Sequence, residues 1–345
     1  MLFMLAWVSV TLCMFSALGY FVGRNTPAEL RFLEPRRAPT MDEAIITYPV
    51  EYSLRSQEKN DAIFVGDSTC RSGIDPAEFE RLTGLRAYNL GSQGKAGPMA
   101  YTLTAMAYLS KHPAPRVVVY CISPVVFDFG HTRDDSMRDR LLANYGPEVP
   151  GLFPWTQSIL YFIQRGSVTA LGAPWAWIAG RREDVREVPL VGMEMDTYRT
   201  LGERTLDAKG YGRLPGRHYS KIHRMKDLGL EWQGKPVAIP DEWTRGAEQL
   251  AETCQERGIP VLLRFSPLPA HCAPTRDFSP LTKWSESLAR SCPGLTVGSP
   301  ILLWYDWSLC WDTYHVNSEG VAKFTSAVAA EVRAVVEKSS RPNQK

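Results

Sequence analysis

The stretch Ala62-Ile63-Phe64-Val65-Gly66-Asp67-Ser68 decides the fold. A short apolar run that ends at a glycine is typical of a strand buried on both faces of a sheet. A helix is predicted soon after it, because Asp75 suits the N-cap, Pro76 the first helical position and Glu78 a capping box. Gly84 is expected to end that helix. The pattern therefore predicts one strand-helix unit, with Asp67 and Ser68 at the carboxyl end of the strand.

The same alternation continues along the chain. Further strands are predicted at 87–90, 117–122, 261–265 and 295–297. Helices are predicted from Gly97 onward, over 243–254, over 281–289 and from Ser318, which is expected to cap the last one. Short apolar strands separated by helices indicate a parallel sheet covered on both faces. The predicted fold class is therefore a three-layer α/β/α domain with a parallel five-stranded sheet.

Composition excludes several classes of protein. The chain has 345 residues, 44% of them hydrophobic and only 22% charged, and its formal net charge is +2. These values exclude a disordered chain and a long coiled coil, and they give no electrostatic footprint for binding nucleic acid. The seven cysteines show no spacing typical of a structural zinc site. No metal and no organic cofactor are expected.

The first residues predict a membrane anchor. Residues 1–22 contain no charged side chain, and as a helix they would span about 33 Å, which exceeds a hydrocarbon core of roughly 30 Å. A cleaved signal peptide is the alternative; the long apolar run and the missing basic leading region favour an uncleaved anchor over 1–23. Four arginines follow this segment (Arg24, Arg31, Arg36 and Arg37), and by the positive-inside tendency they favour a cytoplasmic flank.

The rest of the chain divides into three parts. Residues 24–58, with three prolines in 25–40, are interpreted as a linker and lead-in. The α/β domain is expected over 59–340, interrupted by an insertion at about 124–240. The insertion is too long for a bare loop. It is rich in aromatic residues, which favours a small helical subdomain, although a cap or a partner-facing surface remains an alternative.

Candidate chemical groups lie at strand ends, where ligands bind in parallel α/β folds. Ser68 follows the first strand on a sharp turn, so its hydroxyl would project over the sheet edge and its N–H could stabilise an oxyanion. A serine needs a base oriented by an acceptor, and Asp312 and His315 have the spacing for this. Asp128 and His131 have the same spacing, but they open the irregular insertion. Arg71 could pair with an anionic substrate or with a local carboxylate.

Taken together, these motifs resemble the SGNH (GDSL-type) hydrolase superfamily. The resemblance rests on residues 63–68, on Asn89-Leu90-Gly91-Ser92-Gln93-Gly94 and on Asp312-Thr313-Tyr314-His315, in that order. It implies a flavodoxin-like sheet, with Ser68 as the nucleophile, His315 as the general base and acid, and Asp312 as the orienting carboxylate. It also implies that the N–H of Gly94 is a second oxyanion donor.

One motif departs from that family. The asparagine expected after the third strand is missing, because the chain reads Cys121-Ile122-Ser123-Pro124 there; Ser123 is the nearest polar candidate for the third oxyanion donor. The serine-proline, the anchor and the late D-x-x-H-x-N-x-x-G motif are similar to a membrane-anchored branch that includes the D-alanine transfer protein of teichoic acid synthesis and alginate O-acetyltransferase proteins.

This branch implies an extracytoplasmic, single-pass protein of the cytoplasmic membrane. Its expected activity is to move an acyl group, most simply acetyl, through an acyl-serine onto a cell-envelope polymer. A multi-spanning membrane-bound O-acyltransferase is the expected partner. An esterase that deacylates envelope polysaccharide is one alternative, and a non-catalytic scaffold of an acylation complex is another. The arginine-rich flank argues against the extracytoplasmic orientation that the resemblance implies.

Overall fold

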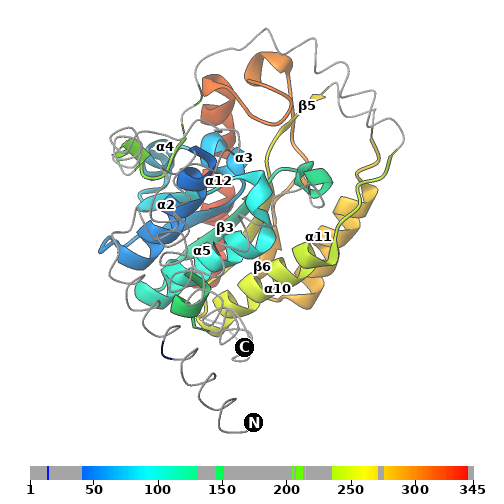
Figure 1. The fold of residues 1–345 in the computed structure, drawn as a ribbon. Coiled ribbons are helices and arrows are strands. Elements are labelled where there is room, and N and C mark those ends of the chain that lie inside the picture. Colours follow the sequence, from blue (N-terminus) through cyan, green and yellow to red (C-terminus); the bar gives the residue numbers. More distant parts are fainter. Residues whose placement is uncertain are drawn as a thin grey trace, which may run out of the picture.

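The computed structural model describes residues 14, 41–129, 141, 145–150, 204–205, 207–212, 214, 235–270 and 276–340. Its main sheet has five strands in the spatial order β2-β1-β3-β4-β6 (Figure 1). They are β1 (Ala62–Gly66), β2 (Ala87–Gly91), β3 (Val117–Ile122), β4 (Val261–Phe265) and β6 (Leu295–Val297). All neighbouring strands pair in parallel. The predicted parallel five-stranded sheet is confirmed, and its order is that of flavodoxin-like folds.

Helices cover both faces of this sheet, because successive side chains of each strand point to opposite faces. On one face, Ile63, Val65, Val118 and Tyr120 share a core with four helices. These are α2 (Met41–Arg55), α5 (Gly97–Lys111), α10 (Asp241–Glu256) and α11 (Ser279–Ser291). On the other face, Phe64 shares a second core with α3 (Ser68–Gly73), α4 (Pro76–Thr83) and α12 (Ser318–Ser340). The α/β/α layering therefore follows from two separate apolar cores.

Shorter elements complete the carboxyl side of the domain. Strands β5 (Leu268–Pro269) and β7 (Trp304–Tyr305) form a two-stranded parallel sheet. Single 3₁₀ turns lie at η2 (Gly94–Ala96), η3 (Val126–Phe129), η4 (Gly146–Glu148) and η7 (Trp307–Leu309).

Helix ends follow local sequence signals. The Asp75 carboxylate accepts hydrogen bonds from the N–H groups of Ala77 and Glu78, and Gly84 ends α4 in a left-handed conformation, as predicted. The cap of α12 differs from the expectation. Asn317 rather than Ser318 is its N-cap, because the Asn317 Oδ1 atom accepts from the N–H groups of Glu319 and Gly320. Ser318 is the first helical residue.

Helix α2 lies inside the segment that the sequence indicates as linker and lead-in, and it was not predicted. Its apolar residues Ile46 and Val50 are buried, but so are the polar residues Thr47 and Ser53. A helix buried on several sides shows no one-sided apolar stripe, so its periodicity is weak. Tyr52 stacks on Tyr88 of β2 with ring centroids 3.4 Å apart, which joins α2 to the edge of the sheet.

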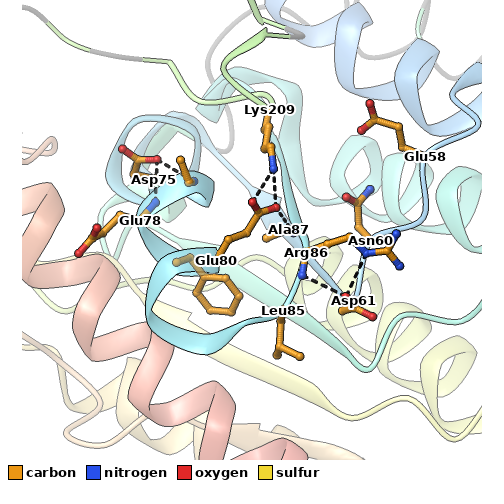
Figure 2. A network of polar contacts seen from close by, with 12 residues as sticks. Glu58, Asn60, Asp61, Asp75, Glu78, Glu80, Leu85, Arg86, Ala87 and Lys209 are labelled. Carbon is orange, nitrogen blue, oxygen red and sulfur yellow. Dashed lines mark hydrogen bonds and ion pairs between the residues drawn. The ribbon is translucent and has the colours of Figure 1, made fainter.

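Part of the long insertion packs against the same edge. The Lys209 Nζ atom lies 2.6 Å and 2.5 Å from the two carboxylate oxygens of Glu80 on α4, as Figure 2 shows. The Lys209 carbonyl accepts a hydrogen bond from the N–H of Asn89 in β2. Residues 207–212 are therefore fixed beside β2, although most of the insertion at 124–240 lies outside the described residues.

The predicted anchor over 1–23 also lies outside the described residues, apart from Met14. Within the part of the chain that the structure describes, no helix combines the length and hydropathy that a membrane span requires.

Candidate active site

Ser68 lies where the sequence predicts it, two residues after the last residue of β1. It is the first residue of α3, and the Asp67 side chain caps this helix by accepting from the N–H groups of Thr69 and Cys70. The turn needs Gly66, because a Cβ atom there would lie 1.6 Å from the carbonyl oxygen of Cys121 in β3. The close packing of the Gly66 and Cys121 backbones therefore fixes the turn that carries Ser68 at the carboxyl end of β1.

The structure brings Ser68, His315 and Asp312 together. The Nε2 atom of His315 lies 3.0 Å from the Oγ atom of Ser68, across 247 positions of sequence. The Nδ1 atom of His315 lies 3.0 Å and 2.9 Å from the two oxygens of Asp312. All three side chains predicted for the site thus form one continuous line of hydrogen bonds.

The turn over 310–316 explains the spacing of this aspartate and histidine. The Oδ1 atom of Asp312 also accepts hydrogen bonds from the N–H groups of Tyr314, at 2.7 Å, and His315, at 2.8 Å. The N–H of Trp311 donates to the carbonyl of His315 at 2.8 Å, which closes the turn. The rings of Trp311 and Tyr314 meet the imidazole edge to face, with centroids 6.2 Å and 6.4 Å away.

Electrostatics fix the tautomer of His315. Burial would raise the pKa of Asp312, but the hydrogen bonds and charge of His315 outweigh burial and hold that pKa below its ordinary value. An ionised carboxylate can only accept, so Nδ1 of His315 carries a proton. In the neutral imidazole, Nε2 is then an acceptor and faces the Ser68 hydroxyl. The arrangement is therefore poised to take a proton from Ser68.

Asp67 connects two strand ends beneath the serine. Its Oδ1 atom accepts from the N–H of Thr69 at 2.8 Å and from the Thr69 hydroxyl at 2.6 Å, and its Oδ2 atom accepts from the N–H of Ser123 at 2.8 Å. Burial raises the pKa of this carboxyl, against the lowering effect of those hydrogen bonds. The motif that contains Asp67 was recognised in the sequence, but this role of Asp67 was not predicted.

Asn89 fixes the other end of the serine-bearing helix. Its amide Nδ2 atom donates to the carbonyls of Cys70 and Ile74, each at 2.9 Å, and its Oδ1 atom accepts from the N–H of Gly91 at 2.9 Å. Carbonyls at a helix carboxyl end lack some intrahelical partners; here the Asn89 amide bonds the Ile74 carbonyl and adds a second bond to the Cys70 carbonyl, which also accepts from the N–H of Ile74. This role was not predicted from the sequence, although an amide inside an apolar strand was a usable signal.

Three candidates for an oxyanion site lie at this edge. Ser68 and Gly94 are the first residues of α3 and η2, so their N–H groups have no acceptor within their own helices. The N–H of Ser123 is already bonded to Asp67. The Ser123 Oγ atom accepts from the N–H of Val125 at 3.3 Å, which leaves its hydroxyl proton to donate. Ser123 is thus primarily a link between β3 and the serine turn.

The remaining candidates have different outcomes. Arg71 lies one turn after Ser68 on α3, and no described carboxylate lies within ion-pairing distance of it, so the predicted alternative of a local partner is not seen there. Of the rival pair, His131 and the side chain of Asp128 lie outside the described residues. Over the described ranges, no group of three metal-ligating side chains is placed to hold an ion.

Comparisons with known proteins add no relative. The chain matches no model of a known protein family. A search among curated proteins likewise finds no match.

Proposed function

We propose that the chain is an SGNH-type serine acyltransferase of the cell envelope, anchored in the cytoplasmic membrane with its α/β domain on the periplasmic or extracellular side. The observation that carries the proposal is the line from Ser68 through His315 to Asp312, at 3.0 Å and 2.9 Å. Side-chain exposures of 18% for His315 and 12% for Asp312 leave a route to solvent while excluding most water. This is the geometry of an activated serine nucleophile.

The first half-reaction forms an acyl-serine. His315 Nε2 takes the proton of the Ser68 hydroxyl as Oγ bonds to the acyl carbon of the donor. The N–H groups of Ser68 and Gly94 are the proposed donors to the oxyanion that develops. The imidazolium, stabilised by Asp312, then gives its proton to the leaving group as the bond to that group breaks.

The second half-reaction transfers the acyl group. A hydroxyl of the polymer loses its proton to His315 and attacks the acyl carbon, and Ser68 leaves and regains a proton from the imidazolium. Acetyl is the simplest acyl group for this step. Transfer, rather than hydrolysis, follows from the resemblance to the membrane-anchored branch, because the triad serves both reactions. A multi-spanning membrane-bound O-acyltransferase remains the proposed partner.

Covalent labelling tests the nucleophile directly. A fluorophosphonate probe should label the wild-type protein at Ser68, and the Ser68→Ala variant should lose the label. Ser92→Ala is a matched control, because that buried hydroxyl has no hydrogen-bond partner among the described residues and should label normally. Equal labelling of wild type and Ser68→Ala would remove the assignment.

Two further measurements separate the alternatives. Acetate release that does not fall when acceptor sugar is added would favour an esterase. Normal polymer acylation in cells that carry His315→Ala would favour a scaffold, an alternative that the missing asparagine supports and the assembled triad opposes. Reporters of membrane topology fused after Lys345 would test the proposed orientation.

A further inference from the structure

Two glycines pack closely on Arg71: Gly212 lies against its side chain and Gly91 against its backbone. It lies on α3 one helical turn after Ser68, where side chains three positions apart share a helix face. A Cβ atom at Gly212 would lie 2.9 Å from the Arg71 Cζ atom, and one at Gly91 would lie 2.5 Å from the Arg71 backbone nitrogen. The Arg71 carbonyl accepts from the N–H of Gly212 at 3.0 Å. The guanidinium therefore extends between the end of β2 and residues 207–212, which the ion pair of Lys209 and Glu80 fixes in place (Figure 2).

The charge of Arg71 has no protein partner in the described part of the chain. Burial lowers the pKa of Arg71, and the only ionisable group that acts on it there is Tyr88, whose pKa burial raises. Arg264 shows the opposite case. Its side chain is 1% exposed, lies 3.5 Å from the Glu331 carboxylate and donates to the carbonyl of Pro300 at 2.5 Å.

This difference separates a structural arginine from one that awaits a ligand. A buried charge without a partner is costly, so buried arginines are normally paired as Arg264 is. Arg71 is half-buried rather than fully buried, so a solute can contact this residue. An anion that bound there would supply the interaction that no described residue gives the guanidinium.

Arg71 lines a narrow cleft beside β2. Its other walls include Tyr48 and Pro49 of α2, Tyr88 and Gly91 of β2, and Gly210. Gly91 pairs in register with Gly66, the residue two positions before Ser68, on the adjacent strand. Adjacent strands lie about 4.8 Å apart, so the cleft and the serine turn are neighbours on one edge.

We infer that Arg71 forms an anion-binding subsite that holds a carboxylate or phosphate group of the acyl acceptor next to the unit acylated at Ser68. That the bound group belongs to an acyl acceptor rests on the proposed transfer function, but anion binding at Arg71 does not require Ser68 to react. A planar guanidinium binds either anion through two parallel hydrogen bonds, which a lysine cannot reproduce. The subsite would thus select acidic glycans or polyol phosphates over neutral ones.

Binding measurements on the full-length Ser68→Ala chain test this without turnover. The probes are oligogalacturonate, its methyl ester with the carboxylates neutralised, and poly(glycerol phosphate). Oligogalacturonate or poly(glycerol phosphate) should bind, and adding Arg71→Gln should weaken that binding by about tenfold or more. The affinity should also fall as salt is raised. Whichever anionic probe depends on Arg71 identifies the group as a carboxylate or a phosphate.

Two variants sharpen the comparison. Gly212→Ala keeps the charge but places a methyl group against the guanidinium, so we expect a smaller loss of affinity than Arg71→Gln gives. Arg81→Gln removes an exposed arginine that is paired with Glu78, and it should leave the affinity unchanged. Equal binding of the methyl ester, no effect of Arg71→Gln, or no binding of either anionic probe would overturn the inference. Failure of the fluorophosphonate test at Ser68 would leave these binding results standing, so the two proposals can fail separately.

Discussion

Replacing Asn89 by Asp tests how the serine-bearing helix is fixed. The change keeps size and shape but turns the Nδ2 donor into an oxygen that faces the carbonyls of Cys70 and Ile74. Two hydrogen bonds worth about 1 kcal/mol each are lost, and a buried acid then faces two acceptors. We expect the free energy of unfolding to fall by about 3–5 kcal/mol at neutral pH.

The pH dependence of this variant has a definite sign. Burial beside carbonyl oxygens raises the pKa of the new carboxyl in the folded state above its unfolded value. Its protonated form can donate again, so stability is retained at low pH and lost as pH rises through the raised pKa. Urea unfolding followed by circular dichroism should therefore show the deficit of Asn89→Asp shrink as the pH is lowered.

Asn317→Asp is the matched control. That side chain caps α12 with its Oδ1 atom, and its Nδ2 atom donates to the carbonyl of Ser308. The variant loses one hydrogen bond and places an oxygen against one carbonyl rather than two, but it gains a negative charge at a helix amino end, so the net cost should be smaller, about 1–2 kcal/mol. If both substitutions lower the unfolding free energy equally, or if the deficit at Asn89 does not depend on pH, the reasoning is refuted.

Two further predictions concern the triad and the turn before it. Asp312→Asn should slow labelling of Ser68 by roughly 10⁴-fold, because the imidazole loses the acceptor that fixes its tautomer. Folding lowers the pKa of Asp312, so its contribution to the free energy of unfolding is present above the unfolded pKa and is lost as pH falls through the folded pKa. Unfolding measurements at acid pH should show that Asp312→Asn lacks this loss. The same loss of stability at acid pH in the variant would contradict the prediction. Gly66→Ala should cost about 3 kcal/mol or more, because its Cβ would meet the Cys121 carbonyl. The same change at Gly84, where nothing lies within 4 Å of an added Cβ, should cost only about 1–2 kcal/mol for its left-handed backbone, and equal unfolding midpoints for the two would contradict this account.

The elements that could be predicted from the sequence are those that carry local signals. Strand β3 is a continuous apolar run, and α4 has both a cap and a terminal glycine, so neither depends on distant contacts for recognition. The spacing of Asp312 and His315 was enough to predict a turn on which both face one another. The meeting of His315 with Ser68 required the parallel sheet as well, because the order of strands decides which loops share an edge.

Other features depend on tertiary contacts that no local pattern encodes. Helix α2 is defined by burial against β2 and α5 rather than by an amphipathic stripe, and it contains Pro49. The role of Asn89 depends on the carbonyls of α3 reaching β2. That no described carboxylate pairs with Arg71 could not be read from the sequence, because it depends on which side chains lie within reach of the guanidinium.

The distance of 247 positions between serine and imidazole has a consequence for biogenesis. A nascent chain presents the Ser68 hydroxyl long before the imidazole of His315 has been synthesised. Until the last turn and α12 fold onto the sheet, the emerging polypeptide holds a serine with ordinary alcohol reactivity. The onset of Ser68 reactivity toward a covalent probe would therefore report that the carboxyl-terminal turn and α12 have folded onto the sheet.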